Sequence, residues 1–221
     1  MVIDIFVRNK SYFMSIFHYF SNDSNQRAQF IFNTIAPIYA KVDKTLQSNY
    51  SKSIDLLKNE ITIKDKSVLD IGTGTGAWAM MFLNNKADVV HGIDFSEKML
   101  EVSKKKHPKI HFSTGNAENL SDIDDGSFDI VTASYVVHGV KADKRAKMIN
   151  EMQRIAKEVI VIHDFVGKTP IFIRFLEFME QSDYKNFKKN FCEELKNITG
   201  WQTKKITSDD GSGLYIAFKN S

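Results

Sequence analysis

The stretch from Lys66 to Trp78, KSVLDIGTGTGAW, constrains the fold of this chain more than any other. It begins with a short apolar run, Val68 to Ile71, which is typical of a strand buried in a parallel sheet. Gly72, Gly74 and Gly76 then allow a sharp turn, because glycine tolerates positive φ and lacks a Cβ. A mostly apolar helix follows the last glycine. The order of strand, glycine turn and helix predicts a nucleotide-binding α/β unit.

A second apolar run, residues 89–94, ends in an acid, and this spacing refines the prediction. Asp94 lies 18 residues after Gly76, where such units place the acceptor for ribose hydroxyls. The turn reads D-x-G-x-G-x-G from Asp70, not the nicotinamide pattern G-x-G-x-x-G. It resembles motif I of the class I S-adenosylmethionine-dependent methyltransferases. The resemblance implies that the carboxylate and ammonium end of S-adenosylmethionine lies over the glycine turn and that its ribose meets Asp94.

The same resemblance implies contacts to the adenine ring. Phe95 offers a flat apolar face to adenine, and Met99 could flank the ring, although core packing is the alternative for both. Asn116 stands where the family has the acid of G-D-A, and its amide oxygen can still accept from the adenine amine. Glu118 is the alternative partner. The implied cofactor-binding set is Asp70, Gly72, Thr73, Gly74, Gly76, Asp94, Phe95, Met99, Asn116, Ala117, Glu118 and Ser134.

The fold expected from these patterns is α/β, a three-layer α/β/α Rossmann-like sandwich with a mostly parallel seven-stranded sheet. Residues 201–206 and 214–218 flank the turn D-D-G-S-G and predict a C-terminal antiparallel hairpin, which nicotinamide domains normally lack. We expect an N-terminal helical lid or extension over residues 1–62. The methyltransferase core is expected over 63–221, with a short helical insertion at about 168–197.

Composition favours one folded domain and excludes several classes of site. The 221 residues are 43% hydrophobic, and a net charge of +3 does not require a nucleic acid or membrane partner. Cys192 is the only cysteine, which excludes an intrachain disulfide and a thiolate metal cluster and fits a cytoplasmic setting. The sequence has no helix-turn-helix, zinc pattern or clustered basic face, so we expect a small-molecule acceptor and no nucleic acid.

The first 25 residues are apolar but interrupted by charges, and they contain no run of the roughly 18 apolar residues that a spanning helix needs. We expect a helix packed on the domain or on a partner subunit, without stable membrane insertion. The protein would then be a monomer or a homodimer. A natural start at Met14 is an alternative.

Two side chains are candidates for catalysis. Residues 29–39 resemble the F-x-x-x-A-x-x-Y segment of ubiquinone and menaquinone biosynthesis methyltransferases, which implies that Tyr39 is a lid residue; packing within a helix is the alternative. His138 follows the fourth expected strand, where ligands of parallel sheets bind, and could move a proton. Its alternative is a polar loop residue beside the cofactor. His163 and Asp164 end the fifth strand, but no convincing set of metal ligands can be assembled there.

The predicted function is S-adenosylmethionine-dependent methyl transfer to an unidentified, small-molecule acceptor. A catalytically silent S-adenosylmethionine-binding interaction protein is one alternative. A NAD-dependent oxidoreductase is another, and the glycine spacing and the C-terminal hairpin argue against it.

Overall fold

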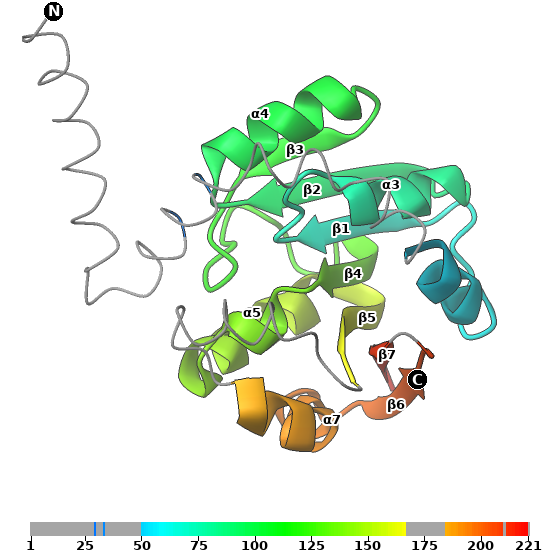
Figure 1. Ribbon diagram of the computed structural model, residues 1–221, viewed down its shortest axis with the longest axis vertical. Helices are drawn as coiled ribbons and strands as arrows, with labels where there is room; N and C mark the ends of the chain where they lie inside the picture. The colour runs from blue at the N-terminus through cyan, green and yellow to red at the C-terminus, as the bar shows by residue number, and fades with distance from the viewer. Residues whose placement is uncertain (1–28, 30–32, 34–49, 167–183, 210, 221) are drawn as a thin grey trace, which may run out of the picture.

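The computed structural model describes residues 29, 33, 50–166, 184–209 and 211–220 (Figure 1). Residues 50–58 are helical and lead into the sheet. The strands are β1 (Ser67–Ile71), β2 (Val89–Asp94), β3 (His111–Thr114), β4 (Phe128–Ser134), β5 (Ala156–Phe165), β6 (Gln202–Thr207) and β7 (Ser212–Phe218). The helices are α3 (Ala77–Asn84), α4 (Glu97–Lys106), the 3₁₀ turn η1 (Val137–Gly139), α5 (Ala142–Ile155) and α7 (Tyr184–Thr199).

The described strands form one seven-stranded sheet in the order β3-β2-β1-β4-β5-β7-β6. The first five strands are parallel, whereas β7 is antiparallel to both β5 and β6. This arrangement confirms the expected sheet with its C-terminal antiparallel hairpin. Because β1, β2, β4 and β5 run in the same direction, the loops that follow them meet at one edge of the sheet, where ligands of such folds bind.

Each face of the sheet has its own apolar core, since neighbouring residues of a strand point to opposite faces. In β5, Val159 and Val161 pack with residues 50–58 and α3, and we call this side the α3 face. Ile160 and Ile162 pack with α5 and α7 on the other side, the α5 face. Figure 1 shows the helix of residues 50–58 and the α5–α7 pair on opposite sides of β4 and β5.

Two helices begin at residues that suit a helix N-terminus. Gly76 caps α3 in the left-handed conformation, with a φ of 80°. Ser96 is the N-cap of α4, and its Oγ accepts a hydrogen bond from the Met99 amide at 3.2 Å. Glu97 in the first turn and the basic residues 104–106 in the last turn suit the helix dipole. Ser96 and these charged residues therefore stabilise the two ends of α4.

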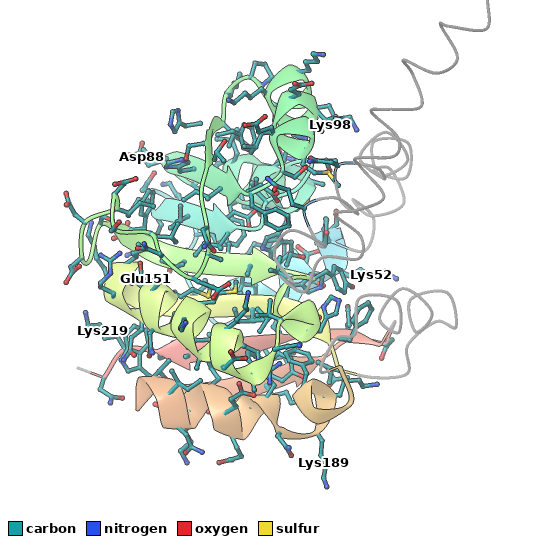
Figure 2. The ribbon with its side chains drawn as sticks, turned by 90° about the vertical axis from the view of Figure 1, so that its left-hand side faces the viewer. Lys52, Asp88, Lys98, Glu151, Lys189 and Lys219 are labelled. Carbon is teal, nitrogen blue, oxygen red and sulfur yellow. The ribbon has the colours of Figure 1, made fainter. Side chains whose placement is uncertain are left out.

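Several charged side chains project from the outside of the molecule. Figure 2 labels Lys98 of α4, Lys189 of α7 and Lys219, which directly follows β7, and all three are exposed. Among the described residues, no helix has the length and apolar character needed to cross a membrane. Phe187 and Phe191 of the expected insertion are buried in the core of the α5 face. The aromatic residues at 172, 175 and 178 lie outside the described residues.

Candidate functional site

The glycine turn between β1 and α3 is held against the end of β2. Gly72, Gly74 and Gly76 have φ values of 70°, 53° and 80°, in the left-handed region that favours glycine. The amides of Gly72 and Thr73 both donate to the carbonyl of Ile93, at 2.7 and 2.9 Å. The turn is therefore fixed next to the residue that precedes Asp94.

One side of this turn is closed and the other is open. A Cβ on Gly72 would lie 2.4 Å from the side chain of Val136, which belongs to the loop after β4. Among the described residues, a Cβ on Gly74 would meet nothing within 4 Å. The loop after β4 therefore packs directly on the first glycine, whereas no described residue fills the space above Gly74, where a ligand could approach bare backbone.

Asp94 is bound to the glycine turn at the end of β2. It is 6% exposed, and its Oδ2 accepts from the Gly74 amide at 2.8 Å while its Oδ1 accepts from the Ser96 amide at 2.8 Å. Burial raises the pKa of this carboxyl group, and the backbone amides oppose the rise. Since each carboxylate oxygen has two lone pairs, each can accept one further hydrogen bond.

Asp70 lies beneath the turn in a position that fits a cationic ligand group. It is 1% exposed, and neither carboxylate oxygen has a hydrogen-bond partner among the described residues. The buried Thr73 hydroxyl likewise has none. Burial raises the pKa of Asp70 to about 7, and Asp94 adds to the rise. The Thr73 side chain and the Ala79 amide oppose it without forming well-aligned hydrogen bonds.

The residues expected around adenine lie between β2 and α4, within α4 and on the loop after β3. Phe95 is half-buried and Met99 is buried, with 2% of its surface exposed. Asn116 is exposed, and its Oδ1 accepts from the Glu118 amide at 3.0 Å. The Glu118 carboxylate forms an ion pair with Lys144 at 3.4 Å. Asn116 and Glu118 thus already have protein partners, while Phe95 keeps an accessible ring.

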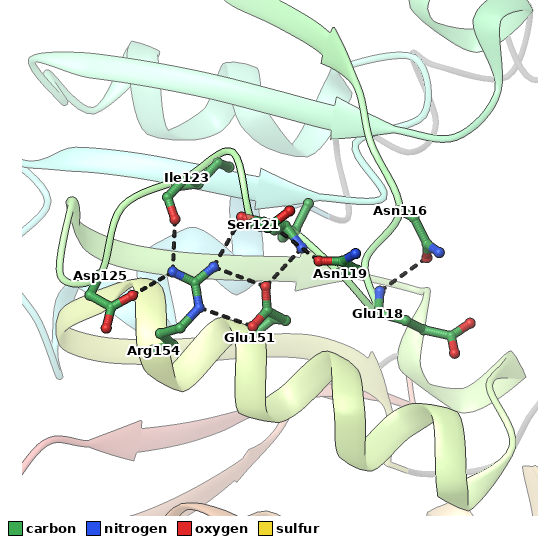
Figure 3. Close-up of polar contacts among 9 residues, drawn as sticks. Asn116, Glu118, Asn119, Ser121, Ile123, Asp125, Glu151 and Arg154 are labelled. Atoms are coloured by element: carbon green, nitrogen blue, oxygen red, sulfur yellow. Dashed lines mark hydrogen bonds and ion pairs between the residues drawn. The ribbon is translucent and has the colours of Figure 1, made fainter.

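Arg154 of α5 fixes the loop that carries Asn116 (Figure 3). Its guanidinium donates to the carbonyls of Leu120 and Ile123, at 3.0 and 2.7 Å, and to the Asp125 carboxylate at 2.6 Å. Glu151, which also binds Arg154, accepts from the Leu120 amide at 2.7 Å. These carboxylates raise the pKa of Arg154 further above its ordinary value. The loop's position therefore depends on α5.

Two residues of the N-terminal segment contact the loop after β2. The Gln29 side-chain amide donates to the Phe95 carbonyl at 2.9 Å, and the Ser96 hydroxyl donates to Asn33 Oδ1 at 2.6 Å. Ser96 Oγ therefore links Asn33 to the N-terminus of α4. Tyr39, the predicted lid residue of the same segment, lies outside the described residues.

Ser134 ends β4 and contacts a buried histidine on the α3 face. The Ser134 Oγ is 2.9 Å from Nδ1 of His163, and Ser53 Oγ is 2.9 Å from its Nε2. The His163 ring stacks on Trp78 with centroids 4.7 Å apart. His163 therefore joins helix 50–58, α3 and the end of β4.

His138 and Asp164 form a second polar pair, on the α5 face. His138 Nδ1 lies 2.7 Å from Asp164 Oδ1, and the His138 amide donates to Oδ2 at 3.2 Å. The histidine is 7% exposed and Asp164 is fully buried. The rings of Tyr135 and Phe165, 4.7 Å apart, lie beside this pair and are half-buried.

The sequence analysis did not assign three residues that contribute to this site: Asp164, Val136 and Arg154. The sequence places His163 and Asp164 together at a strand end, but adjacent strand residues point to opposite faces. A signal for Asp164 was available, since β4 and β5 are neighbouring parallel strands and their carboxyl ends meet. Among the described residues, no group of three or more His, Cys, Asp or Glu side chains could hold a metal ion.

Comparisons with known proteins point to methyltransferases. Residues 68–158 match the family model described as a methyltransferase domain. The ubiquinone/menaquinone biosynthesis C-methyltransferase of Campylobacter jejuni is 30% identical over 62% of this chain and 63% of its own length. The chain thus spans less than two thirds of that relative. The demethylmenaquinone methyltransferase of Lactococcus lactis is 28% identical over 90% of this chain and 82% of its own.

A solved structure supports the fold. Magnesium protoporphyrin IX methyltransferase from Synechocystis PCC 6803 with bound S-adenosylmethionine superimposes with a TM-score of 0.68 at 17% identity, covering 90% of this chain and 99% of that one. S-Adenosylmethionine is the cofactor of such methyltransferases, and the glycine turn, Asp94 and the Asp70 carboxylate, which is unpaired among the described residues, fit it. In sequence and in fold, the chain is similar to S-adenosylmethionine-dependent methyltransferases, and its residues 68–158 match their methyltransferase domain.

Proposed function

We propose that this chain transfers a methyl group from S-adenosylmethionine to a small, planar, hydroquinone-type acceptor. The observation that carries the proposal is Asp94, whose two oxygens are fixed by the amides of Gly74 and Ser96. Both oxygens keep the capacity to accept one more hydrogen bond, as a ribose diol requires. No described residue fills the space above Gly74, which leaves room there for that ribose.

Asp70 would bind the ammonium end of the cofactor, directly or through the turn. Its carboxylate has no hydrogen-bond partner among the described residues, and an unpaired buried acid is costly unless a ligand completes it. Phe95 would lie against adenine, with Asn116 and Glu118 at its polar edge. When bound, S-adenosylmethionine supplies an activated methyl group on a positively charged sulfur.

The acceptor would lie beyond the loop after β4, against Tyr135 and Phe165. These two half-buried rings offer apolar faces to a planar ligand. The relatives from Campylobacter jejuni and Lactococcus lactis carry names of quinone biosynthesis, which favours a hydroquinone among planar acceptors. His138 and Tyr39 are the candidate groups for taking the acceptor's proton.

Calorimetric titration with S-adenosylmethionine, S-adenosylhomocysteine and NADH tests the cofactor, and Asp94→Ala tests its site. We expect the first two ligands to bind and NADH not to bind. Loss of two hydrogen bonds to a charged acceptor should weaken S-adenosylhomocysteine binding about 100-fold, or ~3 kcal/mol.

Asp88→Ala is the matched control, because Asp88 is an exposed acid just before the other end of β2. It should bind like the unchanged protein. Asp94→Asn keeps one acceptor oxygen, and it provides the same test if the alanine variant does not fold. Unchanged affinity in both folded Asp94 variants, or binding of NADH alone, would overturn the proposal.

A further inference from the structure

We infer that His138 and Asp164 act as a dyad that accepts a proton from the methyl acceptor, with Asp164 as the positioning residue. The inference rests on the proposed methyl transfer and adds to it the chemical class of the acceptor: its nucleophilic form must arise by loss of a proton. Neither residue is explained by the cofactor site.

The carboxylate of Asp164 is held in one orientation by three donors. Oδ1 accepts from His138 Nδ1 at 2.7 Å and from the Phe165 amide at 2.8 Å, and Oδ2 accepts from the His138 amide at 3.2 Å. A carboxylate only accepts hydrogen bonds, so the neutral imidazole donates its proton from Nδ1. The ring lone pair is therefore on Nε2, which is the atom that can take a proton.

A buried carboxylate beside a neutral imidazole contributes little to the stability of a fold, because its desolvation costs free energy. Asp164 is fully buried in a face that is packed mostly with aliphatic and aromatic side chains. Well-packed apolar residues usually serve stability as well as a buried charged pair or better. The pair becomes useful when the ring acquires a positive charge, because the carboxylate then stabilises the imidazolium.

The dyad lies next to the cofactor turn. Val136, two residues before His138, would be 2.4 Å from a Cβ on Gly72, so the loop that carries the histidine packs on the turn. Tyr135, between β4 and Val136, has a φ of 54°, which is uncommon for a bulky residue and is found where backbone strain serves a site. The strained residue re-aims the chain from β4 into η1.

Other titratable groups near the dyad come from three elements. Tyr135 and His138 have ring centroids 6.5 Å apart. Arg145 of α5 lies over the Phe187 ring, which is itself 6.3 Å from the His138 ring. The Arg145 guanidinium is paired through two 2.8 Å hydrogen bonds with Glu194 of α7, which offsets its charge. Within the described part of the chain, Asp164 is a charged group in direct contact with His138.

The proposed step balances as follows. A hydroxyl, N–H or acidic C–H proton of the acceptor passes to Nε2, and the electron pair that it leaves forms the new bond to the methyl carbon, at that atom or at a carbon conjugated with it. The methyl–sulfur bond breaks and its electron pair stays on sulfur, so the sulfonium charge disappears. The imidazolium, paired with Asp164, later releases its proton to water.

The test compares Asp164→Asn, His138→Gln and the double variant with 1,4-dihydroxynaphthalene as the methyl acceptor under anaerobic conditions. General-base catalysis is worth roughly 10²- to 10⁴-fold, so we expect kcat at pH 7 to fall about 100-fold or more in each single variant. The double variant should fall no further than His138→Gln, because the two residues act as one unit. The acidic limb of the kcat profile should move to lower pH in Asp164→Asn. His91→Gln, on β2 away from the dyad, is the control and should keep full activity.

Nitrogen-15 NMR of labelled histidine gives a readout that needs no turnover. The protein has six histidines, and the His138 signals are those missing from His138→Gln. We expect one Nδ1–H tautomer in the unchanged protein and a mixture in Asp164→Asn.

The dyad would be overturned by mixed tautomers in the unchanged protein or by an unchanged pH profile of kcat in Asp164→Asn. Calorimetric binding of S-adenosylhomocysteine would still support the cofactor in that case. The reverse pattern, a fixed tautomer without cofactor binding, would overturn the proposed function instead. Binding without methyl transfer to the probe would overturn the hydroquinone acceptor, and the NMR result would still decide the dyad.

Discussion

Replacing Asp70 by asparagine should stabilise the free protein at neutral pH and weaken the binding of its cofactor. Asp70 is buried at the end of β1, and its carboxylate has no hydrogen-bond partner among the described residues. Asparagine keeps the shape of the side chain and removes the charge. Its amide can donate to the Thr73 hydroxyl, which also has no partner in the described part of the chain.

The size of the effect follows from the pKa of Asp70, which burial raises from an ordinary 3.8 to about 7. The folded state binds this proton more tightly than the unfolded chain does. The contribution of this proton to the free energy of unfolding is therefore fully present below pH 3.8. It is lost as the pH rises to about 7, at up to about 1.4 kcal/mol per pH unit. Above pH 7, the ionised group costs the folded state about 4 kcal/mol, which Asp70→Asn should recover in part.

Urea unfolding at pH 5, 6, 7 and 8 measures this directly. The unchanged protein should lose stability relative to Asp70→Asn across the series, and the difference between the two curves isolates Asp70 from Asp94, whose pKa is also raised. Asp88→Asn, at an exposed acid, should run parallel to the unchanged protein. Parallel curves for Asp70→Asn as well would refute the reasoning.

The same variant reports on the cofactor. A cation bound beside Asp70 favours its ionised form, so binding of S-adenosylmethionine at pH 6 should release a proton from Asp70. Calorimetry in two buffers of different ionisation enthalpy counts this proton. Asp70→Asn should bind more weakly and release about one proton fewer; equal proton release in the two proteins would remove Asp70 from the ammonium site.

Two further predictions concern the turn and its neighbouring loop. Gly72→Ala should lower the free energy of unfolding by about 2–4 kcal/mol, because its Cβ would clash with Val136 at 2.4 Å in a left-handed backbone. Gly74→Ala would meet no atom of the described residues within 4 Å, so it should cost only about 1–2 kcal/mol in urea unfolding and chiefly reduce cofactor affinity in calorimetry. Equal stability of the two would contradict the packing of Val136 on the turn. Arg154→Ala should lower the free energy of unfolding by about 2–4 kcal/mol, since two loop carbonyls lose a charged donor. Wild-type stability in that variant would show that the loop holds its place without α5.

Much of the fold was predictable because its signals are local. The β1 strand, the three glycines and the Ser96 cap depend on residues within a few positions, through backbone sterics and short-range hydrogen bonds. The spacing from Gly76 to Asp94 could be interpreted because one strand, one helix and one strand occupy a nearly constant length of chain. The C-terminal hairpin was predictable from its turn residues for the same reason.

The roles of His163 and Asp164 were not predictable in the same way. They are adjacent in the sequence, yet one joins Ser53 on the α3 face and the other joins His138 on the α5 face. From the sequence, the two residues could only be placed together at a strand end, where no convincing set of metal ligands could be assembled. The pleat of the strand separates the two side chains, and which residue faces which core depends on the packing of distant helices.

The sequence by itself therefore determined the nucleotide-binding unit, its acid at Asp94 and the C-terminal hairpin, because each depends on residues within a short stretch of chain. Only the tertiary structure decided which polar groups meet across the sheet: Asp164 with His138, Arg154 with the loop of residues 120–125, and Val136 with Gly72. These contacts join residues that are 26 to 64 positions apart in the sequence. Local propensity carries no information about them, because they form only when the burial of apolar faces brings the strand ends to one edge of the sheet.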